Sequence, residues 1–266
     1  MNIVVCVKYV PDATSDRTFS ESDNTTDRLG VEGLLSELDE YAVEEGLKLV
    51  ESGAADGSHE STVTVLTVGP DKAADAIKKS LQMGAHAGVH VSDEAIHGSD
   101  AAPTSLILAE AVKKIGVVDL ILTGMSSTDA AMGVVPTMLA ERLGLPQVTL
   151  AGSLTVEGGI ATIRRDGDAA SVTVTASLPA LVAVTDQINE PRYPSFKGIM
   201  AAKKKPVETW SLADLGVDAE LVGLAAAWTT VESFAKRPPR AVGQIITDEG
   251  EGGTKLAEFL SAQKFV

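Results

Sequence analysis

The chain has 266 residues, of which 44% are hydrophobic and only 4% aromatic, and its formal net charge is −15. This length predicts one large domain, or one domain with an extension. The strong negative charge repels phosphate backbones and argues against nucleic-acid binding. No apolar run approaches the roughly 20 residues that span a bilayer, and the N-terminal residues lack the pattern of a signal peptide. We therefore expect a cytoplasmic protein.

Metal and disulfide chemistry find little support in the residue types present. Cys6 is the only cysteine, and one thiol forms neither an intrachain disulfide nor a cysteine zinc cluster. The four histidines have no metalloprotease spacing, and we expect them on the surface or in loops: His59, His86, His90 and His97. The sequence predicts no metal site.

The first half of the chain alternates between strand and helix patterns. Runs rich in Ile and Val predict buried strands, and apolar residues at three- and four-residue steps predict helices. Strands are expected at 2–7, 62–68, 88–91 and 119–123, and helices at 36–52, 71–84, 103–114 and 130–143, the third opening at Pro103. A long polar loop is expected at 11–33. Such alternation predicts a parallel sheet with helices on both faces.

The rhythm changes in the second half. Four strand-like segments with short turns predict a β-meander added to the sheet, at 147–156, 159–165, 171–176 and 180–184. From residue 206 the periodicity is lost, and only 255–263 looks helical. This tail could pack on a partner subunit or be a partly disordered terminus. The predicted fold is an α/β, Rossmann-like sheet of the adenine-nucleotide α-hydrolase kind, with a meander and a C-terminal arm.

The richest chemical signal is the turn TGMSSTDAAMGVVP at residues 123–136, between a strand and a helix. Ligands of open α/β sheets lie at the carboxyl ends of strands, where a helix N-terminus offers free N–H groups to a phosphate. Hydroxyl side chains and two glycines favour close approach by a ligand. No Walker A or GxGxxG pattern is present. Ligand binding and simple helix capping both remain open, and Asp129 could be a cap, a ribose contact or a solvated turn residue.

No catalytic constellation stands out. The sequence has no Ser-His-Asp order, nucleophile elbow or paired-carboxylate motif. Glu44 and Glu45 are interpreted as a solvated helix face. These observations favour a binding or carrier protein over a self-contained enzyme.

A basic, partly apolar segment follows the last expected strand. Residues 186–205 read DQINEPRYPSFKGIMAAKKK and contain Arg192, Lys197 and the lysine run 203–205. Two prolines predict a loop rather than a helix. Apolar side chains beside this positive charge predict a surface that binds another protein, although a solubilising charge run is the simpler alternative.

Several motifs in order resemble the β subunit of electron-transfer flavoproteins. They are VCVKYVPD, AVEEGLKL, VGPDKAADAIKKSLQMGA, VDLILTG and INEPRYPSFKGIMAAKKK. The resemblance runs from about residue 1 to 220. The resemblance implies a heterodimer with an α subunit that holds most of the FAD, and an electron carrier rather than a catalyst. It implies an α/β core at 1–205 that ends in a recognition loop at 186–205, and a C-terminal extension at 206–266 that packs on the α subunit.

The resemblance also implies a structural AMP in the β subunit. Its pocket would be formed by Cys6, Ser36, Glu37, Leu38, Asp39 and Val68, and by the turn residues Gly124, Met125, Ser126, Ser127, Thr128, Asp129, Ala130, Ala131, Met132, Gly133, Val134 and Val135. The sequence departs from the family, which often has Asn-Pro at the positions of Ser36-Glu37 and Gln near Val134. These departures concern the adenine and ribose contacts more than the phosphate turn.

The recognition loop of the family docks acyl-CoA dehydrogenases of fatty acid β-oxidation, and the electrons then pass to a membrane electron-transfer-flavoprotein:quinone oxidoreductase. An exposed aliphatic residue inserts into the dehydrogenase, and the corresponding position here is Phe196, where Leu is common. The matching loop residues are Asn189, Glu190, Pro191, Arg192, Tyr193, Phe196, Ile199 and Met200.

Two other functions remain as alternatives. A bifurcating electron-transfer flavoprotein would hold a second FAD in place of AMP and oxidise NADH; the opening residues resemble the VKQVPDT pattern of that group but depart at Tyr9 and Ala13. A universal-stress-type regulatory protein would bind ATP as a homodimer, and it would leave the NEPRY segment unexplained.

Overall fold

The computed structural model describes residues 1–53, 61–240 and 243–266. Residues 1–232 form one compact unit, and residues 233–266 form a second, small one. The first unit contains the residues of both predicted sites.

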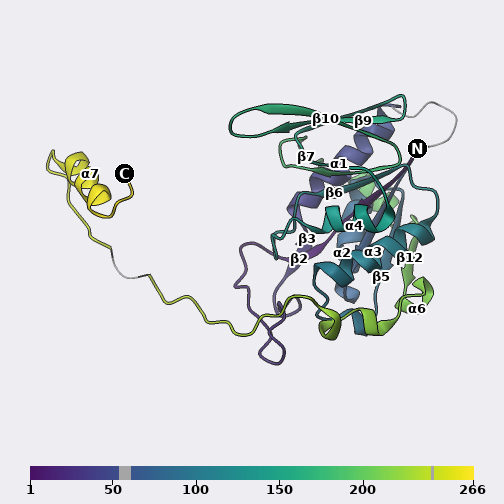
Figure 1. Ribbon diagram of the computed structural model, residues 1–266, viewed down its shortest axis with the longest axis horizontal. Helices are drawn as coiled ribbons and strands as arrows, with labels where there is room; N and C mark the ends of the chain where they lie inside the picture. Colours follow the sequence, from purple (N-terminus) through teal and green to yellow (C-terminus); the bar gives the residue numbers. More distant parts are fainter. Residues whose placement is uncertain (54–60, 241–242) are drawn as a thin grey trace. The chain divides into compact units, whose positions relative to one another are not determined.

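The first unit is organised around a parallel sheet of seven strands (Figure 1). Their spatial order is β12-β5-β4-β1-β6-β11-β7, and every pairing is parallel. The strands are β1 (Asn2–Cys6), β4 (Thr62–Val68), β5 (Ala87–Val91), β6 (Leu120–Gly124), β7 (Gln147–Ala151), β11 (Ala180–Val184) and β12 (Val207–Trp210). Two short antiparallel strands, β2 (Tyr9–Pro11) and β3 (Gly33–Leu35), pair beside this sheet.

Helices cover both faces of the sheet, as predicted. Alternate side chains of a strand point to opposite faces, and the core is accordingly divided into two clusters. Helices α1 (Glu37–Glu51) and α2 (Ala74–Met83) pack on one face, and α3 (Ala101–Ile115) and α4 (Val135–Leu143) pack on the other. The predicted α/β fold with a Rossmann-like sheet is therefore confirmed.

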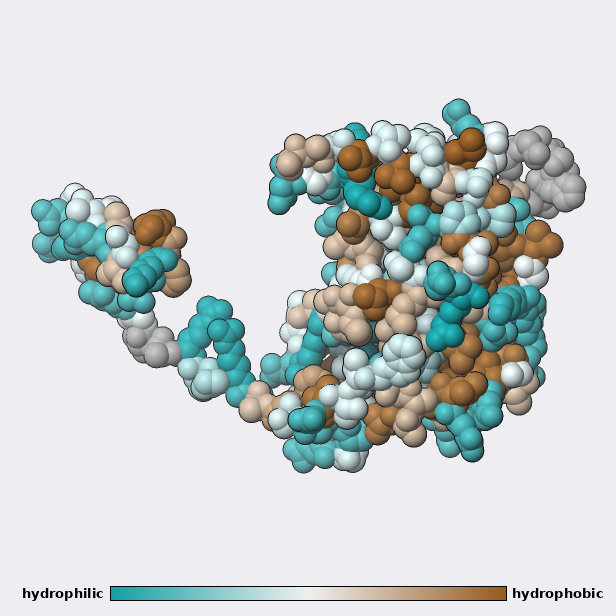
Figure 2. Space-filling model, viewed as in Figure 1, coloured by the Kyte–Doolittle hydropathy of each residue, from teal (hydrophilic) through white to brown (hydrophobic). Residues whose placement is uncertain are grey.

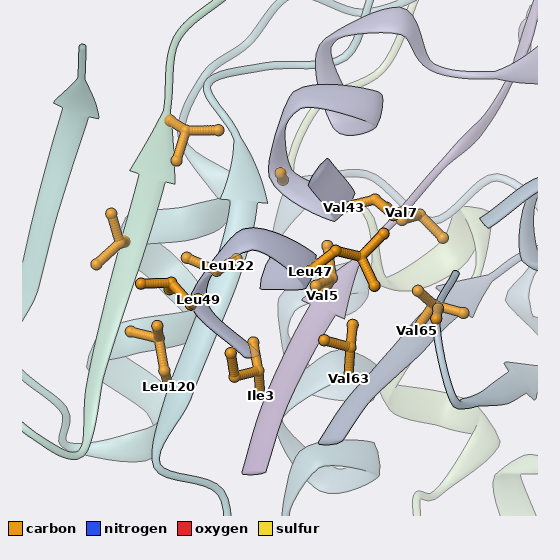
Figure 3. Close-up of a cluster of buried hydrophobic side chains, with 14 of the residues drawn as sticks. Ile3, Val5, Val7, Val43, Leu47, Leu49, Val63, Val65, Leu120 and Leu122 are labelled. Carbon is orange, nitrogen blue, oxygen red and sulfur yellow. The ribbon is translucent and has the colours of Figure 1, made fainter. Parts of the chain in front are cut away.

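Helix α1 lies close against the central strands. Figure 3 shows Leu47 and Leu49 of this helix directed toward strand side chains that include Val5 and Leu122. A Cβ on Gly46 would lie 3.3 Å from Val5 Cγ2 and 3.4 Å from Leu122 Cδ1. A glycine at this position therefore lets the helix axis approach the sheet.

The predicted meander exists, but it is not part of the main sheet. Strands β8 (Ser153–Glu157), β9 (Ile160–Asp166) and β10 (Ser171–Ser177) form a separate three-stranded antiparallel sheet. The segment expected as one strand at 147–156 is divided into β7 and β8. Leu150, the last residue but one of β7, has a φ of 60°. This left-handed backbone conformation departs from the extended form just before the break between the two strands.

Two predicted helices begin at other residues than expected. The helix expected at 130–143 starts at Val135, because Ala131 and Gly133 have left-handed φ angles of 53° and 66°, which a right-handed helix excludes. The helix expected to open at Pro103 starts at Ala101, where the Asp100 side chain accepts a hydrogen bond from the Ala102 N–H.

The segment after residue 190 contains more regular structure than predicted. Helix α5 (Phe196–Ala202) lies within the segment interpreted as a loop. Pro191 and Pro194 both precede this helix, so neither interrupts it. Strand β12 was missed because it is a four-residue edge strand with three exposed residues. The core thus continues beyond residue 205 through β12 and the short helix α6 (Leu212–Leu215).

In the described residues of the second unit, helix α7 (Gly252–Ala262) is the one regular element. It corresponds to the helix predicted at 255–263. Large apolar side chains of this unit are exposed, among them Ile245, Leu256 and Phe265. Figure 2 shows hydrophobic residues on the surface of this helix.

The histidines only partly fit the prediction of surface or loop positions. His90 is buried in β5, and its Nε2 lies 3.0 Å from the Gly69 carbonyl oxygen. His86 and His97 are exposed, the latter beside Asp23. His59 lies outside the described residues. Within the described ranges, no group of three His, Cys, Asp or Glu side chains is placed to hold a metal ion.

None of the helices in the described part of the chain combines the length and the apolar character needed to cross a bilayer.

Leu122→Ala tests the packing of α1 on the sheet. Leu122 is fully buried, and its truncation leaves a cavity, so we expect the free energy of unfolding to fall by about 2–5 kcal/mol. Urea denaturation measures this change. Val117→Ala, at a side chain that is 77% exposed, is the matched control and should change stability by less than about 0.5 kcal/mol. Equal effects of the two substitutions would contradict this assignment of the core.

Candidate functional site

The predicted nucleotide residues lie at the point where the strand order reverses. From β1 the chain adds β4 and β5 on one side, and β6 is then added on the other side of β1. Ligands of open α/β sheets bind at such a switch point, outside the carboxyl ends of the strands. Cys6, Val68 and Gly124 end the three neighbouring strands β1, β4 and β6. Parallel pairing therefore brings these residues to one edge of the sheet.

The start of α1 lies against this edge, close to Gly124 and held by Asp39. A Cβ on Gly124 would lie 2.8 Å from the Leu38 carbonyl oxygen and 2.6 Å from Asp39 Oδ1. The Asp39 carboxylate accepts a hydrogen bond of 2.8 Å from the Lys8 N–H, and it also accepts one from the Gly124 N–H. The loop after β1, the end of β6 and the first turn of α1 are thus held together around one buried carboxylate.

Burial controls the protonation of two groups in this cluster. It raises the pKa of Asp39 from 3.8 to about 7, against the opposing effect of the Lys8 N–H and the Lys8 charge. Burial, with a smaller contribution from Asp39, raises the pKa of the Cys6 thiol to about 12. Cys6 is therefore a neutral thiol near neutral pH, and it is not activated as a nucleophile.

Asp129 in the turn after β6 is neither a helix cap nor a solvated residue. Its carboxylate is fully buried and lies 2.8 Å from Lys8 Nζ and 2.8 Å from Arg28 Nη2. Burial raises the pKa of Asp129, but the charges of Lys8 and Arg28 outweigh this effect, so the pKa lies well below its ordinary value. The two cations and one carboxylate leave this cluster with a net positive charge, in a chain whose total charge is strongly negative.

The long loop between β2 and β3 contributes residues that the sequence analysis missed. Arg28 binds Asp129, and Arg17 Nη1 donates a hydrogen bond of 2.7 Å to the Thr128 carbonyl oxygen. Lys8 Nζ also lies 3.3 Å from Ser127 Oγ. Their positions depend on contacts about 100 residues or more apart in sequence, which local patterns do not reveal.

Two buried hydroxyl groups at this edge lack hydrogen-bond partners in the part of the chain that the structure describes. Ser36 Oγ and Thr123 Oγ1 are buried and have no hydrogen-bond partner among the described residues. The first turns of α1 and α4 have no side-chain cap, whereas Asp100 and Ser195 cap α3 and α5. Uncapped helix starts and unpaired hydroxyls are the groups that an anionic, polar ligand would satisfy. The residues present therefore fit a nucleotide at this edge.

The remaining predicted pocket residues differ in exposure. Ser36 and Asp39 are buried and Leu38 is half-buried, whereas Glu37 is exposed. In the turn, residues 125–129 are half-buried, residues 130–134 are exposed, and Val135 is half-buried. The inner half of the turn thus lies against the sheet edge, and the outer half forms its rim.

The predicted recognition loop at residues 186–205, the recognition segment, lies on the α1 and α2 side of the sheet. Tyr193 is 92% exposed and Phe196 is 81% exposed, whereas Arg192 binds two glutamates of α1. Ile199 and Met200 are also exposed, as is Glu190, and Asn189 and Pro191 are half-buried. A groove of about 370 Å³ runs between α2 and α5, next to this segment.

The interpretation of Glu44 and Glu45 as a solvated helix face was wrong. Both are buried, Glu44 beside Arg192 and Glu45 beside Lys48 and Asn189. Buried charged groups require such partners. Two of them, Arg192 and Asn189, come from a segment more than 140 residues away.

Asp39→Asn tests the buried carboxylate through the pH dependence of stability. The folded-state pKa is about 7 and the ordinary value is 3.8, so the stability associated with this group is complete below about pH 4 and is lost as the pH rises toward 7. Relative to the variant, we expect the wild type to lose about 2–3 kcal/mol of unfolding free energy between pH 5 and pH 8. Urea denaturation at both pH values measures this. Parallel pH profiles would show that Asp39 is already ionised at pH 5.

Comparisons with known proteins agree with this geometry. The model of the electron transfer flavoprotein domain matches residues 23–215. The chain is 47% identical over 265 residues to electron transfer flavoprotein subunit beta of Mycobacterium tuberculosis, covering 100% of this chain and 99% of the relative. It is 31% identical over 276 residues to the subunit beta of Megasphaera elsdenii, covering 100% of both. It is 33% identical over 247 residues to caffeyl-CoA reductase-Etf complex subunit CarD of Acetobacterium woodii, covering 93% of this chain and 92% of the relative.

These matches confirm the resemblance found in the sequence motifs and extend it over the whole chain. They favour it over a universal-stress-type protein, since the relatives named above are electron transfer flavoprotein or Etf complex subunits. The chain belongs to the electron transfer flavoprotein family.

Proposed function

We propose that this chain is the β subunit of a heterodimeric electron transfer flavoprotein. It works as part of an electron carrier and is not a self-contained catalyst. Full-length similarity to proteins named subunit beta supports this assignment. The partner is an α subunit that holds most of the FAD, and the FAD supplies the redox chemistry of the complex.

The C-terminal extension, residues 206–266, packs on the α subunit in this proposal. Its second half exposes large apolar side chains, with Ile245 86% exposed and Phe265 72% exposed. Exposed apolar groups concentrated in a short segment are typical of a protein-binding surface. The first part of the extension, through β12 and α6, is also anchored in the core of this chain.

AMP is the proposed ligand at the carboxyl edge of the sheet. The observation that carries this proposal is the combination of a positively charged cluster with unpaired buried hydroxyls at the switch point. The serine and threonine side chains of the turn and the N–H groups at the starts of α1 and α4 would bind the phosphate. Ser36 and Thr123 would donate to or accept from the remaining polar atoms. A ligand that binds only the folded chain also stabilises it.

The exposed aromatic side chains of the recognition segment dock acyl-CoA dehydrogenases in this proposal, and electrons leave through a membrane electron-transfer-flavoprotein:quinone oxidoreductase. Phe196 is the anchor, because a large exposed apolar group at the centre of a polar surface supplies most of the binding energy of many interfaces. The neighbouring lysines would increase the rate of encounter with an acidic partner.

A bifurcating flavoprotein is the second candidate. The resemblance of the opening residues VKYVPD to the VKQVPDT pattern of that group favours it. In that case a second FAD would occupy the AMP position.

Counting the nucleotides released from the denatured heterodimer tests the proposal. We expect one FAD and one AMP for each complex, measured by chromatography after co-purification with the α subunit. A complex that carries Gly124→Ala should release FAD but little AMP on denaturation. The added Cβ would lie 2.6 Å from Asp39 Oδ1 and would displace the start of α1. Gly167→Ala is the control, since its nearest contact would be at 3.4 Å.

Two FAD molecules per complex would establish the bifurcating candidate instead. A chain that binds ATP as a homodimer and no α subunit would refute the proposal as a whole.

Phe196→Ala tests the docking role. Removing the exposed ring takes away the anchor, so we expect the KM for an acyl-CoA dehydrogenase to rise about tenfold or more. FAD content should stay at one per complex, because the side chain is 81% exposed and lies outside the core. Steady-state electron transfer at varied dehydrogenase concentration measures the effect. Val117→Ala, an exposed apolar residue just before β6, is the control; an unchanged KM in the Phe196 variant would exclude this residue as the anchor.

A further inference from the structure

The recognition segment is attached to the core at both ends. At its start, Asn189 Nδ2 donates to the Tyr41 carbonyl oxygen at 3.1 Å and to Glu45 Oε2 at 3.0 Å. At its end, Lys205 Nζ donates to the carbonyl oxygens of Leu81 and Gly84 at 2.9 and 3.0 Å. The first pair of contacts is made to α1, and the second is made to the C-terminal end of α2. The segment is therefore not a free loop.

Arg192 makes the strongest of these attachments. Its guanidinium contacts Glu44 through Nε and Nη2, at 2.7 and 3.0 Å. It contacts Glu51 through Nη1 and Nη2, at 2.6 and 2.9 Å. Its backbone N–H also donates to Glu44 Oε2 at 3.2 Å. Glu44 and Glu51 are seven residues apart, which is about two helical turns, so one arginine spans two carboxylates on the same face of α1.

The chemistry of this contact is specific for arginine. A planar guanidinium binds two carboxylates at once with fixed geometry, whereas a lysine ammonium is a point charge. Hydrogen bonds from Arg192 lower the pKa of Glu51, even though burial acts in the opposite direction. Two carboxylates of α1 therefore compensate the charge of Arg192, and this charge is not available to attract a partner.

Helix α5 is fixed by a close contact with α2. A Cβ on Gly198 would lie 2.5 Å from the Gln82 carbonyl oxygen, so only glycine permits this separation of the two helices. Ser195 Oγ accepts a hydrogen bond of 3.0 Å from the Gly198 N–H and caps the helix. Phe196 is the first residue of α5, and its position follows from these contacts.

From these contacts we infer that α1 and α2 hold residues 189–205 in the conformation that binds a protein partner, and that Arg192 is the positioning residue for the Tyr193 and Phe196 side chains. This inference rests on the proposed docking function. Fixing the segment before binding lowers the conformational entropy that an interface would otherwise lose. Two of the five cations, Arg192 and Lys205, position the segment. The exposed Lys197, Lys203 and Lys204 are left to attract an acidic surface on the partner.

The test uses the complete heterodimer with a purified acyl-CoA dehydrogenase supplied with its acyl-CoA. For Arg192→Gln we expect the KM for the dehydrogenase to rise about tenfold with little change in kcat. FAD and AMP contents should be unchanged, and amide hydrogen exchange in residues 189–204 should become faster. Arg192→Lys should restore little of the lost affinity, because it cannot contact both glutamates.

Two variants separate positioning from charge attraction. Lys197→Gln removes an exposed cation, so it should weaken the dependence of KM on salt and leave amide exchange unchanged. Arg192→Lys keeps the positive charge, so it should keep the salt dependence of the wild type while amide exchange in the segment becomes faster. An Arg192 variant that instead loses salt dependence with normal exchange would show that this residue attracts the partner, and the inference would be wrong.

Two further variants guard against a general loss of folding. Glu51→Gln removes one arm of the contact at a side chain that is 57% exposed, and Gly198→Ala displaces α5 without changing any charge. Both should raise KM and speed exchange in the segment while FAD and AMP are retained. Loss of either nucleotide in the Glu51 variant would make the contact a general structural one and overturn the inference.

The Phe196 variant separates the inference from the docking function on which it rests. A normal KM for Phe196→Ala would refute docking through this segment. A raised KM for Phe196→Ala together with a normal KM for Arg192→Gln would refute only the positioning role.

Discussion

The close packing of α1 on the central strands is the constraint on which both sites depend. The helix can approach the sheet because Gly46 has no side chain against Val5 and Leu122. Its first turn can reach the end of β6 because Gly124 has none against Leu38 and Asp39. Protein interiors tolerate little added volume at such contacts. Moving this helix by even a small distance would alter the sheet edge and the recognition segment together.

Helix α1 joins the two sites through different parts of its surface. Its start, at Ser36 and Asp39, forms part of the carboxyl edge of the sheet, where AMP is proposed to bind. Its buried glutamates, Glu44 and Glu45, hold the recognition segment through Arg192 and Asn189. A ligand that orders the first turn of α1 would therefore also act on the element that holds the segment. The structural role proposed for AMP has a direct physical basis in this arrangement.

Charge is distributed unevenly in this acidic chain. Lys8 and Arg28 lie beside Asp129 at the carboxyl edge of the sheet. A second group of cations lies in the recognition segment. The first group surrounds a buried carboxylate, and an unpaired buried charge would lower the stability of the fold. The second group is divided into cations that bind the core and cations that face solvent. Net charge alone predicts none of these local differences.

The sequence by itself determined the alternation of strands and helices, the turn at residues 123–136 and the family motifs, because these are local patterns of apolar residues, glycines and charges. Only the tertiary structure decided that Asp129 is a buried partner of Lys8 and Arg28, that Glu44 binds Arg192, and that β12 joins the sheet. Each of these contacts joins residues more than 100 positions apart, and no local pattern carries such information. The separate meander and helix α5 depend in the same way on single backbone angles and on packing against neighbouring elements.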